Sequence, residues 1–247
     1  MLRLAFLLAA VAGCTPAPPA TPPDARPDTV LVFTRTEGYR HASIETGVEA
    51  VRALARARGL AVEHTEDPAA FSPAGLAGVG AVVFLSTSGD VLDADGEAAL
   101  RDFVASGGGW LGIHAASDTE HGWPWYGDLV GAYFESHPAI QEGTVRVADA
   151  DHPATRDVPA AWVRTDEWYS FGAPPPTAVR VLLRLDASTV DGTTMGDDHP
   201  LAWAHAVGDG RALYTALGHT AESYAEPLFL SHLDGALCWV ARLDCAR

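Results

Sequence analysis

The sequence predicts an α/β fold in which helices flank a mostly parallel sheet and additional antiparallel strands extend it. In the first half, short β-branched apolar runs alternate with helical apolar patterns, which is typical of consecutive strand–helix units. In the second half, short strand-like runs follow one another, which indicates antiparallel strands. With 247 residues, 48% of them hydrophobic, the chain can bury a sizeable core.

Four strands and two helices are expected in the first half. The strands are expected at residues 29–34, 60–64, 79–85 and 110–113. The first helix would begin after Ser43, whose hydroxyl is a suitable N-cap, and stop at Gly59. The second helix would be capped by Asp93 and end at the glycine run 107–109. This alternation predicts a parallel sheet.

Five strands and one helix are expected in the second half. The strands are expected at residues 144–148, 162–165, 179–185, 201–207 and 211–217. Gly208, Asp209 and Gly210 predict a hairpin turn between the last two strands, and Pro227 is expected to start the final helix. We find no internal repeat and no linker after Asp28, so residues 29–247 are interpreted as one domain.

The amino terminus is typical of an exported protein. In residues 1–13, Arg3 precedes an apolar run that is too short to span a membrane. Residues 11–14 (VAGC) resemble a bacterial lipobox, so residues 1–13 are predicted to be a lipoprotein signal peptide and Cys14 to carry the lipid. The proline-rich residues 14–28 are predicted to be an extended linker. The protein would then be lipid-anchored in the bacterial cell envelope, on its periplasmic or extracellular face. Cleavage by the ordinary signal peptidase would instead give a soluble secreted protein.

The charge of the chain excludes several functions. The 32 acidic and 16 basic residues give a formal net charge of −16, which has the wrong sign for binding nucleic acid. Every basic residue among these 16 is Arg, because the sequence contains no Lys. Schiff-base chemistry, attachment of pyridoxal phosphate and a Walker-type phosphate lysine are therefore excluded.

Two cysteines remain after Cys14. Cys238 and Cys245 do not have a metal-binding spacing. They could form a disulfide if the last helix ends before Cys245, and an exported setting permits this bond. The alternative is a buried thiol at Cys238 and a free thiol near the end of the chain.

Polar residues gather in the loops that follow the predicted strands. In an open α/β sheet, ligands bind outside the carboxyl ends of the strands, so these loops are the favoured place for a site. Five of them offer side chains to one cleft: His41, Asp90, His114, Glu167 and His219.

The order of several short motifs resembles that of the ThuA-like trehalose-utilisation family, from about residue 29 to about residue 241. The motifs are residues 40–44 (RHASI), 107–116 (GGGWLGIHAA), 137–138 (HP), 152–153 (HP), 166–169 (DEWY), 208–211 (GDGR) and 218–219 (GH). The resemblance implies the class I glutamine amidotransferase-like variant of the flavodoxin-like fold. In that superfamily a cysteine nucleophile stands at a strand-to-helix elbow, whereas this chain has His114 there. A thiolate mechanism is therefore excluded, and His114 would act as an acid, a base or a metal ligand.

The site is predicted from these residues. We expect His114, His219 and Glu167 to be catalytic and to meet in one cleft, with His41 on its rim. The cofactor is not fixed by the sequence, but three histidines and a carboxylate suit a divalent metal such as zinc, with ligands His41, His114, Glu167 and His219. The substrate-binding candidates are His41, Asp90, Trp123, Tyr126, Trp168 and Tyr169. For the aromatic residues the alternative is a place in the core, and for Asp90 it is a turn or a helix cap.

The family's link to trehalose implies a small-molecule carbohydrate, either trehalose-type or an oxidised disaccharide, as substrate. Acid/base or metal-assisted chemistry would act on it. One alternative is a carbohydrate-binding lipoprotein without catalysis, and another is a metal-dependent hydrolase of an unrelated substrate. The sequence does not indicate an oligomeric state.

Overall fold

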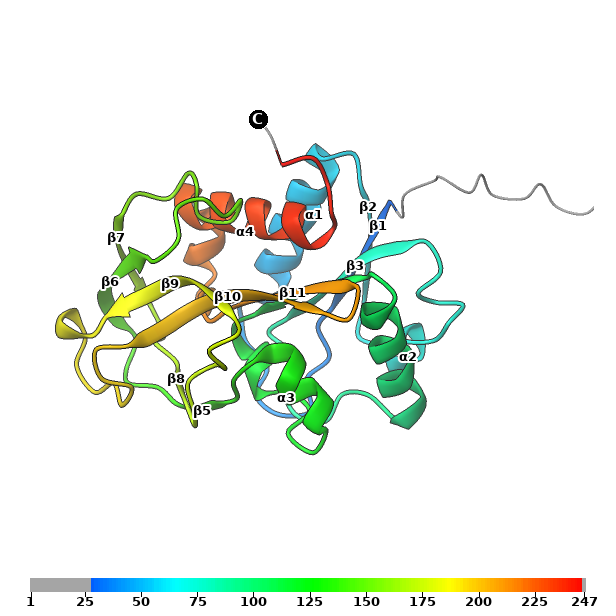
Figure 1. The fold of residues 1–247 in the computed structure, drawn as a ribbon, viewed down its shortest axis with the longest axis horizontal. Helices are drawn as coiled ribbons and strands as arrows, with labels where there is room; N and C mark the ends of the chain where they lie inside the picture. Colours follow the sequence, from blue (N-terminus) through cyan, green and yellow to red (C-terminus); the bar gives the residue numbers. More distant parts are fainter. Residues whose placement is uncertain (1–27, 246–247) are drawn as a thin grey trace, which may run out of the picture.

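The computed structural model describes residues 28–245, and its central feature is a nine-stranded sheet (Figure 1). The strand order is β2-β1-β3-β4-β11-β10-β9-β6-β7. These strands are β1 (Thr29–Phe33), β2 (Ala61–Thr65), β3 (Val79–Leu85), β4 (Gly109–Ile113), β6 (Gln141–Val147), β7 (Ala161–Asp166), β9 (Arg180–Asp186), β10 (His199–Val207) and β11 (Gly210–Thr215). The predicted signal peptide, the lipid site at Cys14 and nearly all of the predicted linker lie outside the described residues.

Four helices cover the sheet. They are α1 (Ile44–Ala57), α2 (Ala94–Ala105), α3 (Pro124–Val130) and α4 (Pro227–Val240). Helices α1 and α4 lie on one face, and α2 and α3 lie on the other (Figure 1). The predicted fold class, a mostly parallel sheet with added antiparallel strands and flanking helices, is therefore confirmed.

Strand direction brings distant segments to one edge of the sheet. Strands β2, β1, β3, β4 and β11 are mutually parallel, and each pair from β11 through β10, β9 and β6 to β7 is antiparallel. After four reversals, β7 again points the same way as β4. The carboxyl ends of β1, β4, β11 and β7 therefore share one edge, although four strands separate β4 from β7.

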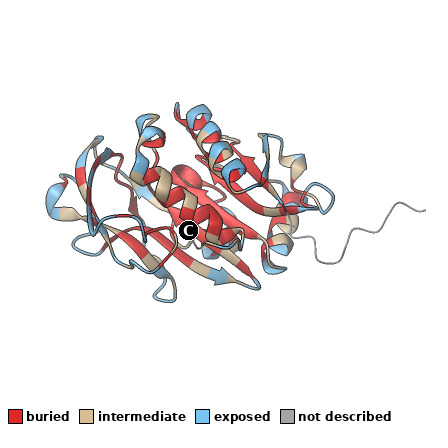
Figure 2. Cartoon of the chain, turned by 90° about the horizontal axis from the view of Figure 1, so that it is seen from above, coloured by how far each residue is buried: buried red, intermediate tan, exposed pale blue. Residues whose placement is uncertain are grey.

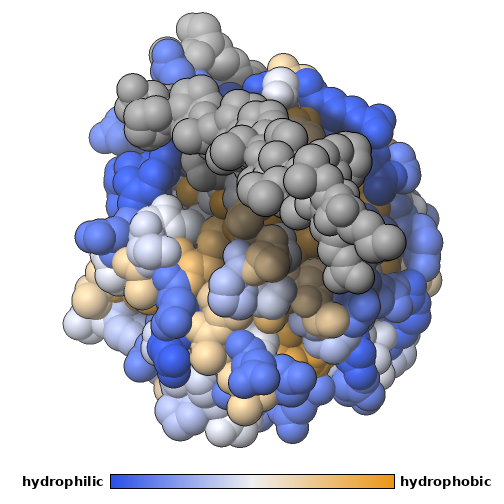
Figure 3. All heavy atoms as spheres, turned by 90° about the vertical axis from the view of Figure 1, so that its right-hand side faces the viewer, coloured by the Kyte–Doolittle hydropathy of each residue, from blue (hydrophilic) through white to orange (hydrophobic). Residues whose placement is uncertain are grey.

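The core lies on both faces of the central strands. Strand β4 is buried along its whole length, and β3 along nearly all of it, as expected for parallel strands covered on both sides (Figure 2). Trp110, Trp203 and Tyr214 are among the largest fully buried side chains. On the face shown in Figure 3, hydrophilic side chains make up much of the periphery.

Local signals explain most element boundaries. The Asp93 carboxylate accepts a hydrogen bond from the Gly96 N–H (2.9 Å), which confirms it as the N-cap of α2. The hairpin turn at Gly208 is also confirmed, since this residue has φ +59° between β10 and β11. Ser43, by contrast, makes no capping hydrogen bond to α1. Its hydroxyl donates instead to the Gly218 carbonyl (3.4 Å), a contact between distant loops that local sequence does not reveal.

Two further features complete the described chain. A two-stranded ladder of β5 (Phe134–Ser136) and β8 (Ser170–Phe171) was not expected from the sequence. Of the two states considered for Cys238 and Cys245, the structure has the disulfide, and α4 ends at Val240, before the second cysteine.

Among residues 28–245, no helix has both the length and the apolar character needed to cross a membrane.

Candidate functional site

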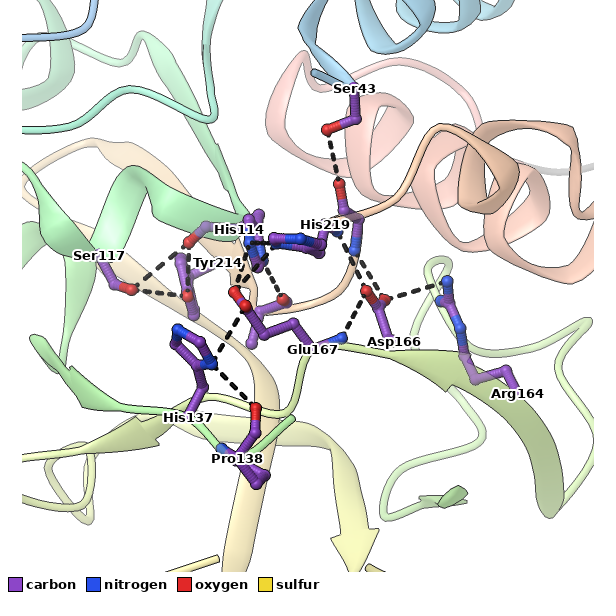
Figure 4. Close-up of polar contacts among 12 residues, drawn as sticks. Ser43, His114, Ser117, His137, Pro138, Arg164, Asp166, Glu167, Tyr214 and His219 are labelled. Carbon is purple, nitrogen blue, oxygen red and sulfur yellow. Dashed lines mark hydrogen bonds and ion pairs between the residues drawn. The ribbon is translucent and has the colours of Figure 1, made fainter. Parts of the chain in front are cut away.

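Four side chains from separate loops meet at the carboxyl edge of the sheet. His41 follows β1, His114 directly follows β4, Glu167 follows β7 and His219 follows β11. One ligand atom from each side chain lies within 4.8 Å of the others. Figure 4 shows three of them converging. We call His41, His114, Glu167 and His219 the His–Glu cluster.

His114 is held rigidly at the end of β4. Its backbone is in the left-handed region (φ +53°), a conformation that costs free energy and that often occurs at functional sites. Its Nδ1 lies 2.8 Å from the Ala216 carbonyl oxygen, and its own carbonyl accepts the Tyr214 hydroxyl hydrogen (2.8 Å). Because a carbonyl only accepts, Nδ1 must donate, which leaves Nε2 to face Glu167 and His219.

The spacing within the His–Glu cluster suits a tetrahedral metal ion. His114 Nε2 lies 3.0 Å from His219 Nδ1 and 3.4 Å from Glu167 Oε2, and His219 Nδ1 lies 3.0 Å from the same oxygen. Ligand atoms about 2.1 Å from a tetrahedral ion are about 3.4 Å from one another. Small outward movements of three side chains would therefore admit a zinc-like ion.

His41 brings a third nitrogen to the cluster and is its fourth potential metal ligand. Its ring centroid lies 4.7 Å from that of His114 and 5.0 Å from that of His219. The side chain is buried rather than on the rim, and its Nδ1 has no hydrogen-bond partner among the described residues. Burial, together with the neighbouring imidazoles of His114 and His219, lowers the pKa of His41 to about 3. The ring is therefore neutral near pH 7, the state that a metal ligand requires.

Glu167 supplies the negative charge of the cluster. Burial alone would raise the pKa of its carboxyl group, but hydrogen bonds with His114 and His219 outweigh burial and lower it. Burial would in turn lower the pKa of His219, and the contact with Glu167 raises it instead. The other carboxylate oxygen, Oε1, lies 3.1 Å from Nδ1 of the half-exposed His137. His137, which entered the sequence analysis only as part of a His-Pro motif, thus contacts the cluster directly.

Asp166 holds two of the cluster loops in place. Its buried carboxylate accepts the backbone N–H groups of Gly218 (2.9 Å), His219 (3.1 Å) and Glu167 (3.0 Å). The buried Arg164 guanidinium lies 3.1 Å from the same carboxylate (Figure 4). It also donates to the Ser223 hydroxyl (2.8 Å). Asp166 was recognised only as part of a motif, because a sequence does not show which backbone groups its carboxylate accepts.

Two aromatic residues predicted to bind substrate belong to the core instead. Tyr126 is fully buried and donates its hydroxyl hydrogen to the Ala116 carbonyl (2.8 Å). Trp168 is fully buried and donates to the Gln141 carbonyl (3.0 Å). Neither ring has a face left for a sugar, so these two predictions are wrong. The period of helix α3 turns Tyr126 toward the sheet, as the alternative interpretation expected.

The other substrate-binding candidates differ in position. Trp123 is 9% exposed and lies against Trp125, with ring centroids 4.8 Å apart, which leaves little of its ring accessible. Tyr169 is buried and packs on His114 with ring centroids 4.3 Å apart, so it holds the His114 ring in place rather than presenting a face to substrate. Asp90 is exposed, and within the described chain it is not among the groups gathered around His41. It is not the cap of α2 either, because Asp93 is.

The fold and this site define an α/β protein with a class I glutamine amidotransferase-like sheet and a histidine–carboxylate cluster at its carboxyl edge. The chain belongs to the ThuA family, described as trehalose utilisation, whose sequence model matches residues 29–240. The sequence resemblance to this family is thereby confirmed. No curated protein matches the chain.

Solved structures share the fold. A ThuA-like protein from Bacteroides uniformis is 24% identical with a TM-score of 0.75, over 91% of this chain and 95% of that one. A ThuA-like protein from Parabacteroides merdae is 19% identical with a TM-score of 0.70, over 87% and 90% of the two chains. A β-galactosidase from Bacillus circulans is 14% identical with a TM-score of 0.57, over 90% of this chain and 32% of that one. At these identities the similarity concerns the fold alone.

Proposed function

We propose that the protein acts on a small carbohydrate, a trehalose-type or oxidised disaccharide, at the His–Glu cluster with a bound divalent cation such as zinc. Membership of the trehalose utilisation family supports the carbohydrate-related part of this proposal. The spacing of His114 Nε2, His219 Nδ1 and Glu167 Oε2, at 3.0–3.4 Å, is the observation that carries the metal-assisted part.

The chain's own residues would orient the ligands. Ala216 fixes the tautomer of His114, and His137 holds Glu167 Oε1 so that Oε2 points toward His114 and His219. A cation bound there supplies Lewis-acid polarisation of a substrate oxygen and a lower pKa for a coordinated water. Without a cation, the hydrogen-bonded pair of His219 and Glu167 would instead act as acid and base, since Glu167 raises the pKa of His219.

The arrangement favours catalysis over binding alone. A module that only binds sugars needs aromatic faces and polar groups but no titratable groups gathered around one point. The His–Glu cluster instead gathers titratable groups around one point, as chemistry requires. A metal-dependent hydrolase of an unrelated substrate would use the same cluster, so the choice of substrate has to be tested directly.

The experiment combines metal analysis with a substrate panel. Purified protein is dialysed with and without a chelator, its metal content is measured, and turnover of disaccharides and their keto derivatives is followed with and without added divalent cations. We expect about one cation per chain and carbohydrate turnover that the chelator abolishes. Turnover that persists after metal removal would support the acid/base route. Turnover of non-carbohydrate esters or amides alone would overturn the proposed substrate class.

We also propose that the chain is lipid-anchored through Cys14 in the cell envelope. The lipobox-like residues 11–14 and the proline-rich residues after them support this placement. Mass spectrometry of protein extracted from membranes should show diacylglycerol on Cys14 as the first residue. Cleavage at any other bond, with an unmodified Cys14, would contradict it.

A further inference from the structure

Tyr39 is the exposed aromatic side chain next to the His–Glu cluster. It is 67% exposed, and its ring meets His41 edge to face, with centroids 4.8 Å apart at 84°. Within residues 28–245, the large hydrophobic side chains that are exposed are Tyr39, Ile140 and Val163. Of these three, Tyr39 contacts a cluster residue directly. The ring of Tyr39 therefore lies at the surface, directly beside the buried His41 of the His–Glu cluster.

The backbone around Tyr39 is fixed by the neighbouring loop. Ser88, which follows β3, donates its hydroxyl hydrogen to the Tyr39 carbonyl (2.8 Å). The Ser88 carbonyl accepts the N–H groups of Glu37 (2.8 Å) and Gly38 (3.2 Å). A Cβ atom on Gly38 would lie only 3.2 Å from Ser88 Oγ, so the two loops pack closely. Tyr39 thus lies on a loop whose backbone is held by hydrogen bonds, and these bonds fix the position of its Cα atom.

The surroundings of Tyr39 offer both an apolar face and charged groups. An aromatic ring has a negative face that attracts weakly positive C–H groups, and the C–H face of a pyranose presents several of them. A tyrosine has only two side-chain torsions to order on binding, so it forms such a contact at low entropic cost. Next to it, the exposed Arg40 pairs with Glu45 (2.9 Å) and Glu66 (2.8 Å), charged groups suited to bonding sugar hydroxyls.

We infer that Tyr39 is the stacking platform for a pyranose ring of the substrate and sets the specificity of the site for carbohydrates. This inference rests on the proposed function, because the sugar on Tyr39 is the one presented to the His–Glu cluster. The loop 35–41 then has two tasks: His41 contributes to the cluster and Tyr39 binds the sugar. The stacking contact is present in both ground state and transition state, so it acts on substrate binding rather than on the chemical step.

The test compares Tyr39→Ala and Tyr39→Phe with the parent protein. Val163→Ala is the matched control, since Val163 is 58% exposed but lies on the opposite side of β7 from Arg164 and Asp166. Binding of the disaccharide panel is measured by calorimetry, with KM, kcat and metal content alongside. We expect Tyr39→Ala to raise Kd and KM about tenfold with kcat and metal content unchanged, and Tyr39→Phe and Val163→Ala to stay within about twofold.

The outcomes separate this inference from the proposed function. If the parent protein neither binds nor converts any carbohydrate, the proposed function fails, and the stacking platform fails with it. If the parent binds a sugar and Tyr39→Ala binds it equally well, the stacking inference alone is overturned. Equal losses in Tyr39→Ala and Tyr39→Phe would assign the contact to the hydroxyl, and a loss of metal in Tyr39→Ala would assign the ring to supporting His41. Either result overturns stacking.

Discussion

At the scale of single residues, His114 determines which chemistry the fold can perform. It stands at the end of β4 with its backbone in the left-handed region, and its Nε2 faces Glu167 and His219. An imidazole there can bind a cation or move a proton, but it cannot form the thioester of a cysteine enzyme.

Replacement of His114 by alanine should therefore abolish most activity. We expect His114→Ala to lower turnover by roughly 10²–10⁴-fold, the usual loss when a catalytic group is removed. It should also cost roughly 1–3 kcal/mol of stability, because the buried Ala216 carbonyl loses its donor. Steady-state kinetics and urea unfolding measure the two effects. His121→Ala is the control, since that exposed histidine pairs with Asp118 and stacks on Tyr133, outside the cluster. Unchanged kinetics with reduced stability would make His114 a purely structural residue.

At the scale of elements, the site depends on how loops from different strands are joined. Asp166 ends β7 and accepts backbone N–H groups from the loop after β11, so one carboxylate aligns Glu167 with His219. Arg164, on the same strand, balances its charge inside the protein. Strand side chains alternate in direction, so residues 164 and 166 point to the same side of β7.

Asp166→Asn tests this connection between loops. The amide keeps one acceptor but removes the charge beside the buried Arg164, which then retains Glu226 at 3.4 Å, so we expect a loss of roughly 1–3 kcal/mol in the free energy of unfolding. Because Glu167 and His219 lose their common anchor, kcat should also fall at temperatures where the variant is folded. Asp186→Asn, which removes a solvent-exposed pair with Arg146, should lower the free energy of unfolding much less. Similar costs for both variants would contradict the anchoring role.

Helix α4 makes stability depend on pH through His232. Burial, with a contribution from nearby Arg164, lowers the pKa of His232 to about 4, although its bond to the Ala154 carbonyl opposes this. The unfolded chain takes up the proton near pH 6.5, so stability is full above that pH and is lost as pH falls toward 4. Between pH 7.5 and 5, the parent should lose about 2 kcal/mol more than His232→Gln in urea unfolding. Equal losses would mean that His232 does not titrate on unfolding.

At the scale of the whole molecule, the sequence predicted what depends on local pattern and chain order. Short apolar runs between helical patterns predicted the parallel strands. Their order along the chain placed His114 and His219 at the carboxyl edge of the sheet, because parallel strands end at the same edge. The sequence left open whether Tyr126 and Trp168 lie in the core, and it missed the ladder of β5 with β8, because that ladder depends on packing between distant segments. The contact of His137 with Glu167 and the exposure of Tyr39 were missed for the same reason.

A cation at the His–Glu cluster would connect segments from across the whole sheet. Its ligands follow β1, β4, β7 and β11, so an ion that binds the folded chain and not the unfolded one should stabilise the entire domain. At a free concentration of 100 times Kd, the gain is about 2.7 kcal/mol. For a domain of this size that corresponds to a rise in Tm of roughly 5–10 °C.

Calorimetric melting of the chelated protein with added cations measures this gain. Zn²⁺ should raise Tm and excess chelator should reverse the rise, whereas Mg²⁺ should have little effect because it prefers oxygen ligands over imidazoles. His114→Ala should lose most of the Zn²⁺-dependent rise, and His121→Ala should keep it, since His121 lies outside the cluster. The rise should also shrink as pH falls, because Glu167 raises the pKa of His219 and a proton on that ring competes with the metal. If neither Zn²⁺ nor other transition-metal cations raise Tm in the parent protein, the cluster is an acid/base site that works without metal.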